Sequence, residues 1–593
     1  MDYRREIDGL RALAVVPVIL SHTGIEMFSG GFVGVDVFFV ISGYLITTII
    51  LAELEQGKFS IVNFYERRAR RILPVLFVIT LVSFILGYFL LMPDEFKNLG
   101  QSFVATSLFL NNILLGSTSG YWDLDSQFKP LLHTWSLGIE EQYYVIVPVL
   151  LLIFWKIGRT SIVYLLWSIF FTSLLFAVWF VDVSAKWSFY LLPTRAWEIC
   201  IGALAAIYST KYSTTVKNFK YSGFISLVGL HLIIFSILVF DNSVLSPGPL
   251  LLIPTVGTVL LIIFCRHNQI AFSVLSNRVM VFLGLLSYSL YLWHQPIFAF
   301  LRAYSEKHPS TSNFLTLILL VFLLSYMTWK FIEKPFRNKL FVGRNLFFFY
   351  SVLGTTVFVI IGLYLNKSYG MASRVFHEGV VISDMDKRIY NERAFDYKKE
   401  SFVDKSVSNL LIIGNSFGRD FTNITVENFD ISRVEIVYRD DLGECIEEKT
   451  NSKTKSLFND ANVIVYASGD YNKDCLLSDI NFANSRGKKI FYVGTKNFGY
   501  NLNWLIRLNK EQRRSQFNPI EESILISDKE MAKAIPSEHF ISLLEPTVVD
   551  GKIPVTDDKG RMLSTDRRHL TKYGALYFGK KAVAYTRYIE IFK

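Results

Sequence analysis

The stretch "RALAVVPVILSH", residues 11 to 22, decides the fold, because ten apolar or small residues stand between an arginine and a histidine. Such a run is typical of a membrane helix. An arginine or a histidine inside such a helix costs free energy. At a rise of about 1.5 Å per residue, the two side chains lie roughly 16 Å apart along a helix, about half of a bilayer core. The stretch therefore predicts a membrane protein that keeps polar groups inside a helical bundle.

The composition of the whole chain supports this prediction. Of 593 residues, 51% are hydrophobic and only 19% are charged, which is typical of a polytopic membrane protein rather than a soluble enzyme. The first apolar segment is not a cleaved signal, since many equally apolar segments follow it and no small-residue cleavage site is evident. After about Asn366 the chain becomes polar and contains no further run long enough to cross a bilayer. We therefore expect a membrane part followed by a soluble part.

The apolar segments predict about eleven membrane spans. They cover residues 8–26, 33–54, 73–92, 139–155, 161–181, 190–208, 222–240, 248–265, 280–303, 313–333 and 346–365. The segment 101–115 is too short and is expected to be a buried or interfacial helix. Lysine and arginine gather in the linkers after the even-numbered spans, as in "ERRARR" (66–71). This pattern places the N-terminus in the cytoplasm and, with an odd number of spans, the C-terminal part outside.

Ionisable residues recur within the apolar segments. They are Arg11, His22, His133, Glu140, Glu141, Arg195, Glu198, His294 and Glu333. Because charged groups at membrane depth usually face a cavity or a partner, they suggest a polar chamber inside the bundle. His22 is the obvious proton handler, since histidine titrates near neutral pH. Arg11 and the arginines of residues 67–71 suit a phosphate-bearing anion, although the cluster 67–71 also fits a role in topology alone.

A series of motifs over residues 5–340 resembles membrane acyltransferase family 3. The motifs are "RALAVVPVILSH", "GGFVGVDVFFVISGYLI", "FYERRARRILP", "HTWSLGIEEQYY", "PTRAWEIC", "LSYSLYLWHQP" and "FIEKPFR", in this order. The resemblance implies transfer of an acetyl or other acyl group from a cytoplasmic acyl-CoA towards an extracytoplasmic glycan. It makes Arg11 and His22 the functional pair, and leaves open which group is the direct base. We expect the donor at Arg11, Arg68, Arg70 and Arg71, with support from Glu140, Glu141, Arg195, Glu198 and His294.

From residue 406 the pattern changes to α/β. "NLLIIGNSF" predicts a buried strand that ends at Ser416 and is followed by a helix, and "ANVIVYASGD" and "KKIFYVGT" predict two further strands. A serine at a strand end can present its hydroxyl while nearby backbone N–H groups face a developing oxyanion. Asp566 and His569 lie three residues apart, a spacing at which the carboxylate orients an imidazole that deprotonates a serine.

Together these residues resemble the SGNH hydrolase/acyltransferase family, whose motifs are a Gly-Asp-Ser turn and a late Asp-x-x-His. The resemblance makes Ser416, Asp566 and His569 a catalytic triad. The chain departs from the pattern at Asn415, where the family has aspartate, and at Phe417, where fused members often have histidine. Gly443 and Asn472 are the candidates for the oxyanion hole, with Gly469 as another possibility.

The four cysteines fall into two groups. Cys200 and Cys265 lie in predicted spans and are expected to be apolar packing residues. Cys445 and Cys475 lie in the exported part, where disulfides persist, so we expect a bridge between them. No spacing of metal ligands and no nucleotide-binding loop stands out. The net charge of +10 follows from the lysines and arginines of the cytoplasmic face and does not indicate nucleic acid.

The expected fold is a polytopic α-helical membrane domain followed by a soluble α/β SGNH-like domain. The expected divisions are 1–340 (acyltransferase domain), 341–366 (last transmembrane helix), 367–405 (linker) and 406–593 (SGNH-like domain). The predicted protein is a multi-pass O-acetyltransferase of the bacterial inner membrane with a periplasmic C-terminal domain. It uses acetyl-CoA and no metal, and acts on a surface polysaccharide or lipid-linked glycan, first of all lipopolysaccharide O-antigen. Three alternatives remain: a peptidoglycan O-acetyltransferase, a membrane transporter with an appended esterase domain, and an outer domain that removes acyl groups.

Overall fold

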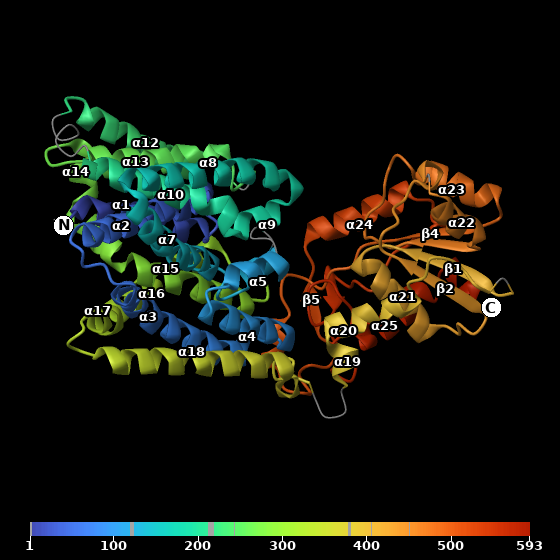
Figure 1. Ribbon diagram of the computed structural model, residues 1–593. Coiled ribbons are helices and arrows are strands. Elements are labelled where there is room, and N and C mark those ends of the chain that lie inside the picture. Colours follow the sequence, from blue (N-terminus) through green and yellow to red (C-terminus); the bar gives the residue numbers. More distant parts are fainter. Residues whose placement is uncertain are drawn as a thin grey trace. The chain divides into compact units, whose positions relative to one another are not determined.

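The computed structural model describes residues 3–118, 124–211, 219–241, 243–376, 381–404, 406–449 and 451–592 (Figure 1). It divides into two compact units. Unit 1 holds residues 1–88, 97–302 and 309–367, and unit 2 holds residues 89–96, 303–308 and 368–593. The boundary between Lys367 and Ser368 falls where the sequence predicts the end of the last apolar segment.

Unit 1 is helical, and each predicted span coincides with a helix. These helices are α1 (Arg5–Ser21), α2 (Gly34–Glu55), α3 (Ile61–Leu90), α7 (Thr134–Ile157), α8 (Arg159–Val183), α10 (Leu192–Lys211), α12 (Ser222–Val239), α13 (Leu252–Phe264), α15 (Arg278–Tyr304), α16 (Thr311–Thr328) and α18 (Arg344–Lys367). Shorter helices are α4 (Pro93–Ser107), α5 (Asn111–Thr118), α6 (Leu124–Gln127), α9 (Ala185–Tyr190), α14 (Ile270–Leu275) and α17 (Lys334–Arg337). The segment 101–115, predicted to be a short helix, is divided between α4 and α5.

Within the described residues, seven helical stretches are long and apolar enough to cross a membrane by length and composition. They contain α2, α3, α7, α8, α12, α16 and α18. Among the other predicted spans, α13 has only 13 residues, while α1, α10 and α15 interrupt their apolar stretches with polar residues such as Arg11, Glu198 and His294. The protein is therefore a multi-pass membrane protein, and its predicted functional residues lie on both groups of helices.

Small residues bring α2 and α10 into close contact. A Cβ atom on Gly43 would lie 1.9 Å from the carbonyl oxygen of Ile199, and one on Gly202 would lie 2.0 Å from that of Val40. Neither position therefore tolerates a side chain. Helices in membranes associate through such small residues, because lipid supplies no hydrophobic driving force between them. This contact fixes α2, whose residues line the pocket described below.

Unit 2 is built on a parallel sheet of five strands in the order β2-β1-β3-β4-β6. The strands are β1 (Ser408–Ile413), β2 (Val434–Arg439), β3 (Val463–Tyr466), β4 (Lys489–Val493) and β6 (Phe540–Ile541), and a separate antiparallel pair joins β5 (Phe517–Pro519) to β7 (Lys552–Pro554). The predicted strands β1, β3 and β4 are confirmed. The prediction missed β2, whose residues "VEIVYR" mix charged with apolar side chains, and β6, which has only two residues.

Helices cover both faces of this sheet. They are α19 (Ile382–Met385), α20 (Lys387–Glu392), α21 (Ser416–Asn428), α22 (Ser452–Asp460), α23 (Leu476–Ser485), α24 (Glu522–Ala534) and α25 (Lys572–Phe578). Leu410 and Ile412 of β1 pack in one cluster with residues of α21 and α25, whereas Leu411 and Ile413 pack in the other with residues of α22, α23 and α24. Figure 1 shows α21 and α25 on the opposite side of the sheet from α22 and α23. The alternation along β1 therefore produces a three-layer α/β/α unit.

The strand order places a switch point between β1 and β3, because the chain leaves β1 towards β2 and then returns to add β3 on the other side. In open parallel sheets, ligands bind beyond the carboxyl ends of the strands at such a point. Ser416 follows β1 there, and the turn containing Gly469 follows β3. The topology thus favours a ligand site at the end of β1, where the sequence predicts the catalytic serine.

The segment 367–405 is not a simple linker, contrary to the prediction. Where it is described, it forms α19, α20 and a short 3₁₀ helix (Arg393–Tyr397), and Tyr390 and Ala394 are buried in the core of unit 2. The Tyr390 carbonyl also accepts a hydrogen bond from the Asn423 amide of α21. These helices are short and only a few of their residues are apolar. The sequence therefore shows no helical period here, and the helices become evident only from their packing against α21.

Candidate functional site

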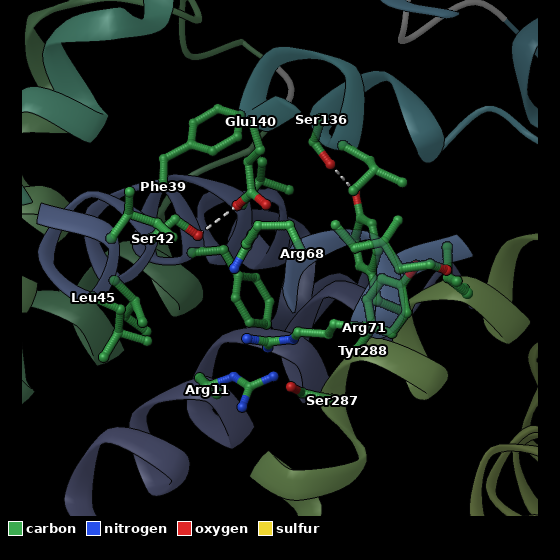
Figure 2. A pocket seen from close by; sticks show the side chains of 18 residues that line it. Arg11, Phe39, Ser42, Leu45, Arg68, Arg71, Ser136, Glu140, Ser287 and Tyr288 are labelled. Atoms are coloured by element: carbon green, nitrogen blue, oxygen red, sulfur yellow. Dashed lines mark hydrogen bonds between the residues drawn. The ribbon is translucent and has the colours of Figure 1, made fainter. Parts of the chain in front are cut away.

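The predicted residues gather at two places, one in each unit. In unit 1 there is a pocket that is partly open to the outside. Its wall is formed by Arg11, Val35, Phe38, Phe39, Ile41, Ser42, Leu45, Ile46, Arg68, Arg71, Ile72, Ser136, Leu137, Glu140, Ser287, Tyr288, Tyr291 and Leu292. These residues come from α1, α2, α3, α7 and α15 (Figure 2). The pocket is an apolar space with a few convergent polar groups, as is usual for a small-molecule site.

Three guanidinium groups and one carboxylate, that of Glu140, line this pocket. Arg11 lies 3.3 Å from the Asp8 carboxylate, and Arg68 lies 3.8 Å from Glu141. Arg71 has no carboxylate within ion-pair distance among the described residues, and Figure 2 shows its guanidinium next to that of Arg11. Arginine matches phosphate geometry with two parallel hydrogen bonds. The pocket can therefore hold a phosphate-bearing ligand.

Arg70 does not line the pocket, contrary to the expectation that it contacts the donor. Its side chain is buried, 3.0 Å from the Glu66 carboxylate, and it lies over the Phe347 ring of α18. Glu66 also contacts Arg344 of α18 at 2.7 Å. Arg70 therefore belongs to an ion cluster that joins α3 to α18. The 3.6-residue period of α3 turns it away from the face that carries Arg68 and Arg71.

The contrast between these neighbouring arginines gives a prediction. Arg71→Gln should weaken binding of coenzyme A about 10- to 100-fold, because it removes a charge-assisted contact, while the amount of inserted protein stays near wild type. Arg70→Gln should instead lower the amount of folded protein, since it leaves the buried Glu66 short of a partner. Coenzyme A titration of purified variants, corrected for abundance, measures both effects. Equal binding defects per folded molecule would contradict this assignment.

The carboxylates of α7 have different surroundings. Glu140 lines the pocket and accepts a hydrogen bond of 2.7 Å from the Ser42 hydroxyl (Figure 2). Glu141 is absent from the lining and faces Arg68, whose guanidinium also lies 4.2 Å from the centre of the Tyr144 ring. Glu140 can therefore contact a ligand in the pocket directly. Glu141 instead contacts Arg68, which lines the pocket.

Beyond Ser136 the pocket wall leads to three histidines. The hydroxyls of Ser136 and Tyr291 are 2.7 Å apart, and Tyr291 donates to the His133 carbonyl. The His294 ring centre lies 5.5 Å from those of Tyr291 and His133 and 5.2 Å from that of His22. The structure therefore brings His22 next to His294.

His133 was noted in the sequence but not included among the predicted site residues. It is 3% exposed, and among the described residues neither of its ring nitrogens has a hydrogen-bond partner. A buried polar group without a partner is unfavourable unless a ligand or water satisfies it. The histidine cluster, defined as His22, His133 and His294, is thus able to receive a polar group or a proton. Spacing along the chain could not have identified it, because its members come from three distant segments.

Arg195 and Glu198 lie apart from the pocket lining. Arg195 is buried and contacts Glu198 at 3.0 Å and Asp36 of α2 at 3.1 Å. Its guanidinium also lies 5.5 Å from the rings of Phe39 and Trp135. Since Phe39 lines the pocket, this ion cluster supports the pocket wall from behind.

In unit 2, the turn after β1 presents Ser416 at the first position of α21. The Asn415 side chain accepts a hydrogen bond from the Phe417 backbone N–H, so it caps the helix as an aspartate would. The Tyr438 hydroxyl donates to the Gly414 carbonyl. Gly414 has φ +156°, and a Cβ there would lie 2.1 Å from the Ala467 carbonyl oxygen. Asn415 therefore caps α21 directly before Ser416.

Asp566 and His569 form the other half of the predicted triad. Asp566 Oδ2 lies 2.7 Å from His569 Nδ1, and Asp566 Oδ1 accepts the backbone N–H groups of Arg568 and His569. The carboxylate thus orients the imidazole and leaves Nε2 available to a serine. The next residue, Leu570, donates its backbone N–H to Asp420, one turn after Ser416 on α21. This bond brings the loop of His569 to the helix that begins with Ser416.

The oxyanion-hole candidates lie on the loops after β2 and β3. Gly469 packs against the Phe417 ring, so the loop after β3 adjoins the serine turn. Asn472 belongs to that loop, but its side chain contacts Cys445 Sγ and the Asp474 backbone N–H. Gly443 is exposed. Their proposed role in the oxyanion hole stays a prediction.

Cys445 and Cys475 form a disulfide in the structure, with Cα atoms 5.0 Å apart. The one group of potential metal ligands among the described residues is Cys445, Glu448 and Cys475, and its two thiols are joined in this bond. Cys200 and Cys265 are buried in unit 1. The disulfide therefore joins the loop after β2 to the start of α23.

Glu444, next to this disulfide, gives a pH-dependence prediction. Burial raises the pKa of Glu444 from 4.5 to about 7, against the opposing hydrogen bond from the Asn472 backbone N–H. The folded state then binds this proton more tightly than the unfolded state, so its contribution to stability is present at low pH and lost as pH rises to about 7. Amide exchange of residues 444–449 and 467–475, corrected for intrinsic rates, should therefore speed up over this range. Glu444→Gln should remove this pH dependence of amide exchange. A Glu444→Gln variant with the same pH dependence as wild type would contradict the prediction.

Comparisons with known proteins identify the family of unit 1. A family model described as an acyltransferase domain matches residues 4–330. The peptidoglycan O-acetyltransferase OatA of Listeria monocytogenes is 31% identical over 363 residues, 58% of this chain and 57% of that protein. The O-acetyltransferase OatA of Staphylococcus aureus strain NCTC 8325 is 30% identical over 354 residues, 57% of this chain and 58% of that protein. The chain thus spans less than two thirds of these relatives. No solved structure matches.

Proposed function

Because the chain belongs to the acyltransferase family whose model matches its residues 4–330, we propose that it is a membrane O-acetyltransferase that modifies a cell-surface glycan. The acceptor that we propose is peptidoglycan, because the Listeria monocytogenes relative is a peptidoglycan O-acetyltransferase. The comparisons give no support to the first expectation, lipopolysaccharide O-antigen. The observation that carries the proposal is the pocket with its three guanidinium groups, of which Arg71 has no carboxylate partner in the described part of the chain.

The proposed donor is acetyl-CoA. Arg11, Arg68 and Arg71 hold its phosphates through charge-assisted hydrogen bonds, and the apolar wall accommodates the pantetheine arm. The acetyl thioester then extends towards Ser136 and Tyr291, at the side of the pocket that adjoins the histidine cluster. This arrangement gives Arg11 a role in donor binding and His22, directly after α1, a role in acyl transfer.

At the histidine cluster, the acetyl group leaves the thiol of coenzyme A for an oxygen nucleophile. The C–S bond breaks as a C–O bond forms, the nucleophile's proton passes to an imidazole, and the imidazolium then passes that proton to the departing thiolate of coenzyme A. General base catalysis of this kind contributes about 10²- to 10⁴-fold in rate. His22 is the proposed base, and His133 and His294 adjoin it as buried imidazoles.

In unit 2 the acetyl group is transferred a second time. Ser416 Oγ attacks the acetyl carbonyl while His569 takes its proton, and Asp566 holds the imidazole. The incoming carrier leaves as its free hydroxyl with that proton. A sugar hydroxyl then attacks the acetyl-serine, its proton passes through His569 back to Ser416, and the acetylated glycan departs. With water in place of the sugar, the same steps describe an esterase.

The proposed location is the bacterial inner membrane, with a cytoplasmic N-terminus and unit 2 outside. This orientation follows from the distribution of lysine and arginine between the loops. A reporter that is active only outside the cytoplasm, fused after Lys593, should be active. Activity of a cytoplasm-only reporter at that position would reverse the orientation.

The test compares cells with and without the gene. Mass spectrometry of muropeptides should show acetylated species only when the protein is present, while other surface polysaccharides stay unchanged. The purified protein should release coenzyme A only when acetyl-CoA and the glycan are both supplied, which separates it from a transporter and from an esterase. Acetylation of a different polysaccharide would retain the enzyme class and replace the acceptor. Unaltered glycans together with no coenzyme A release would reject the proposal.

A further inference from the structure

A buried lysine follows β4 in unit 2 and takes no part in the proposed chemistry. Lys496 is 2% exposed. Its ammonium group lies 2.9 Å from the Asp420 carboxylate, donates to the Arg568 carbonyl at 2.6 Å and lies 3.6 Å from the centre of the Phe417 ring. A lysine is almost never this buried without a specific partner. These three contacts therefore offset the cost of burying its ammonium group.

Each contact of Lys496 lies next to a member of the proposed triad. Phe417 directly follows Ser416, and Asp420 lies one turn further along α21. Arg568 directly precedes His569. The ammonium group thus bridges the helix that carries the nucleophile and the loop that carries the imidazole.

Asp420 completes the bridge from the other side. Its side chain is fully buried and accepts the Leu570 backbone N–H at 3.1 Å and the Asn391 amide at 2.6 Å. The same amide donates to the Ser416 carbonyl at 3.0 Å. The ion pair therefore holds both residues that flank His569, and the Asn391 amide links it to the Ser416 carbonyl at the start of α21.

A buried ion pair contributes little net stability, because desolvation of both charges offsets their attraction. An apolar pair could fill the same space, but it would not fix the donors and acceptors of two separate chain segments. The proton transfer from Ser416 to His569 depends on hydrogen-bond distance between them. The pair thus supplies geometry rather than net stabilisation.

We propose that Lys496 is a positioning residue that, through Asp420, sets the separation of Ser416 from His569. This inference rests on the proposed function of unit 2. Lys496 touches neither substrate nor reacting atoms. Phe417, where the related motif often has histidine, forms the apolar side of the lysine's environment.

The test uses the full-length protein in detergent and a fluorophosphonate probe. In the labelling reaction Ser416 Oγ displaces fluoride from phosphorus, and its proton passes to His569. Lys496→Met should slow labelling at saturating probe about tenfold or more, with little change in the half-saturating concentration. Lys496→Arg should restore part of the rate, because it keeps the charge. Lys488→Met is the matched control: Lys488 lies at the other end of β4, donates to the carbonyls of Asn459 and Ala461, and should leave labelling unchanged.

The outcomes separate this inference from the proposed function. A folded Lys496→Met variant that labels at the wild-type rate overturns the positioning role alone. A wild-type protein that is not labelled at Ser416 overturns the triad and this inference with it. If Lys496→Met does not fold, the double variant Lys496→Met/Asp420→Asn removes both charges together and relieves the unpaired carboxylate. That variant should fold and label slowly, and wild-type labelling by it would likewise reject the role.

Discussion

Ser416→Ala should abolish acetylation of the glycan, with a loss of about a thousandfold or more. Without the serine hydroxyl, unit 2 has no nucleophile to accept the acetyl group. Adding His569→Ala should make the loss little worse, because a base without its nucleophile has nothing to deprotonate. Asp566→Asn should be roughly ten- to a hundredfold less severe, since the imidazole remains but loses the carboxylate at Nδ1.

The measurement is the acetyl content of purified muropeptides from cells that produce each variant at equal level. Ser432→Ala is the control, because Ser432 is exposed in the turn before β2 and should behave as wild type. A Ser416→Ala variant with wild-type acetylation would make unit 2 a binding or positioning module. The chemistry would then lie wholly at the histidine cluster of unit 1.

His22→Ala and Arg11→Ala should each reduce acetylation by at least about a hundredfold while leaving protein abundance near wild type. Arg11 lines the pocket, and His22 adjoins the buried His294 ring, so each variant removes a group from the proposed path of the acetyl group. The two losses should differ in kind. Arg11→Ala weakens coenzyme A binding, whereas His22→Ala leaves binding intact and stops transfer.

Two controls keep this second result interpretable. His231→Ala changes an exposed histidine of α12, whose Nδ1 lies 3.2 Å from the Leu227 carbonyl of the same helix, and should retain activity. Fluorophosphonate labelling of Ser416 should be normal in both pocket variants, because the triad belongs to the other unit. A stably inserted His22→Ala protein with full acetylation would remove this histidine from the mechanism.

Several features of the molecule could be predicted from local sequence. The apolar segments, the strands β1, β3 and β4, the serine turn and the Asp-x-x-His motif all depend on neighbouring residues and on periods of 2 or 3.6. A helix or strand with one buried face repeats its apolar side chains with the period of its backbone, so the sequence shows that period. The association of Asp566 with His569 was equally predictable, because three residues separate them.

Other features depended on packing between distant segments. The sequence alone does not show that Arg71 faces a pocket while Arg70 contacts Glu66, since the direction of each face of α3 is decided by α1, α7 and α18. His133 joins His22 and His294 only because α7 and α15 pack beside α1. Lys496 and Asp420, 76 positions apart in the sequence, meet at the carboxyl ends of the parallel strands. A buried polar group needs a partner from wherever the chain supplies one, and that choice is made by the tertiary structure.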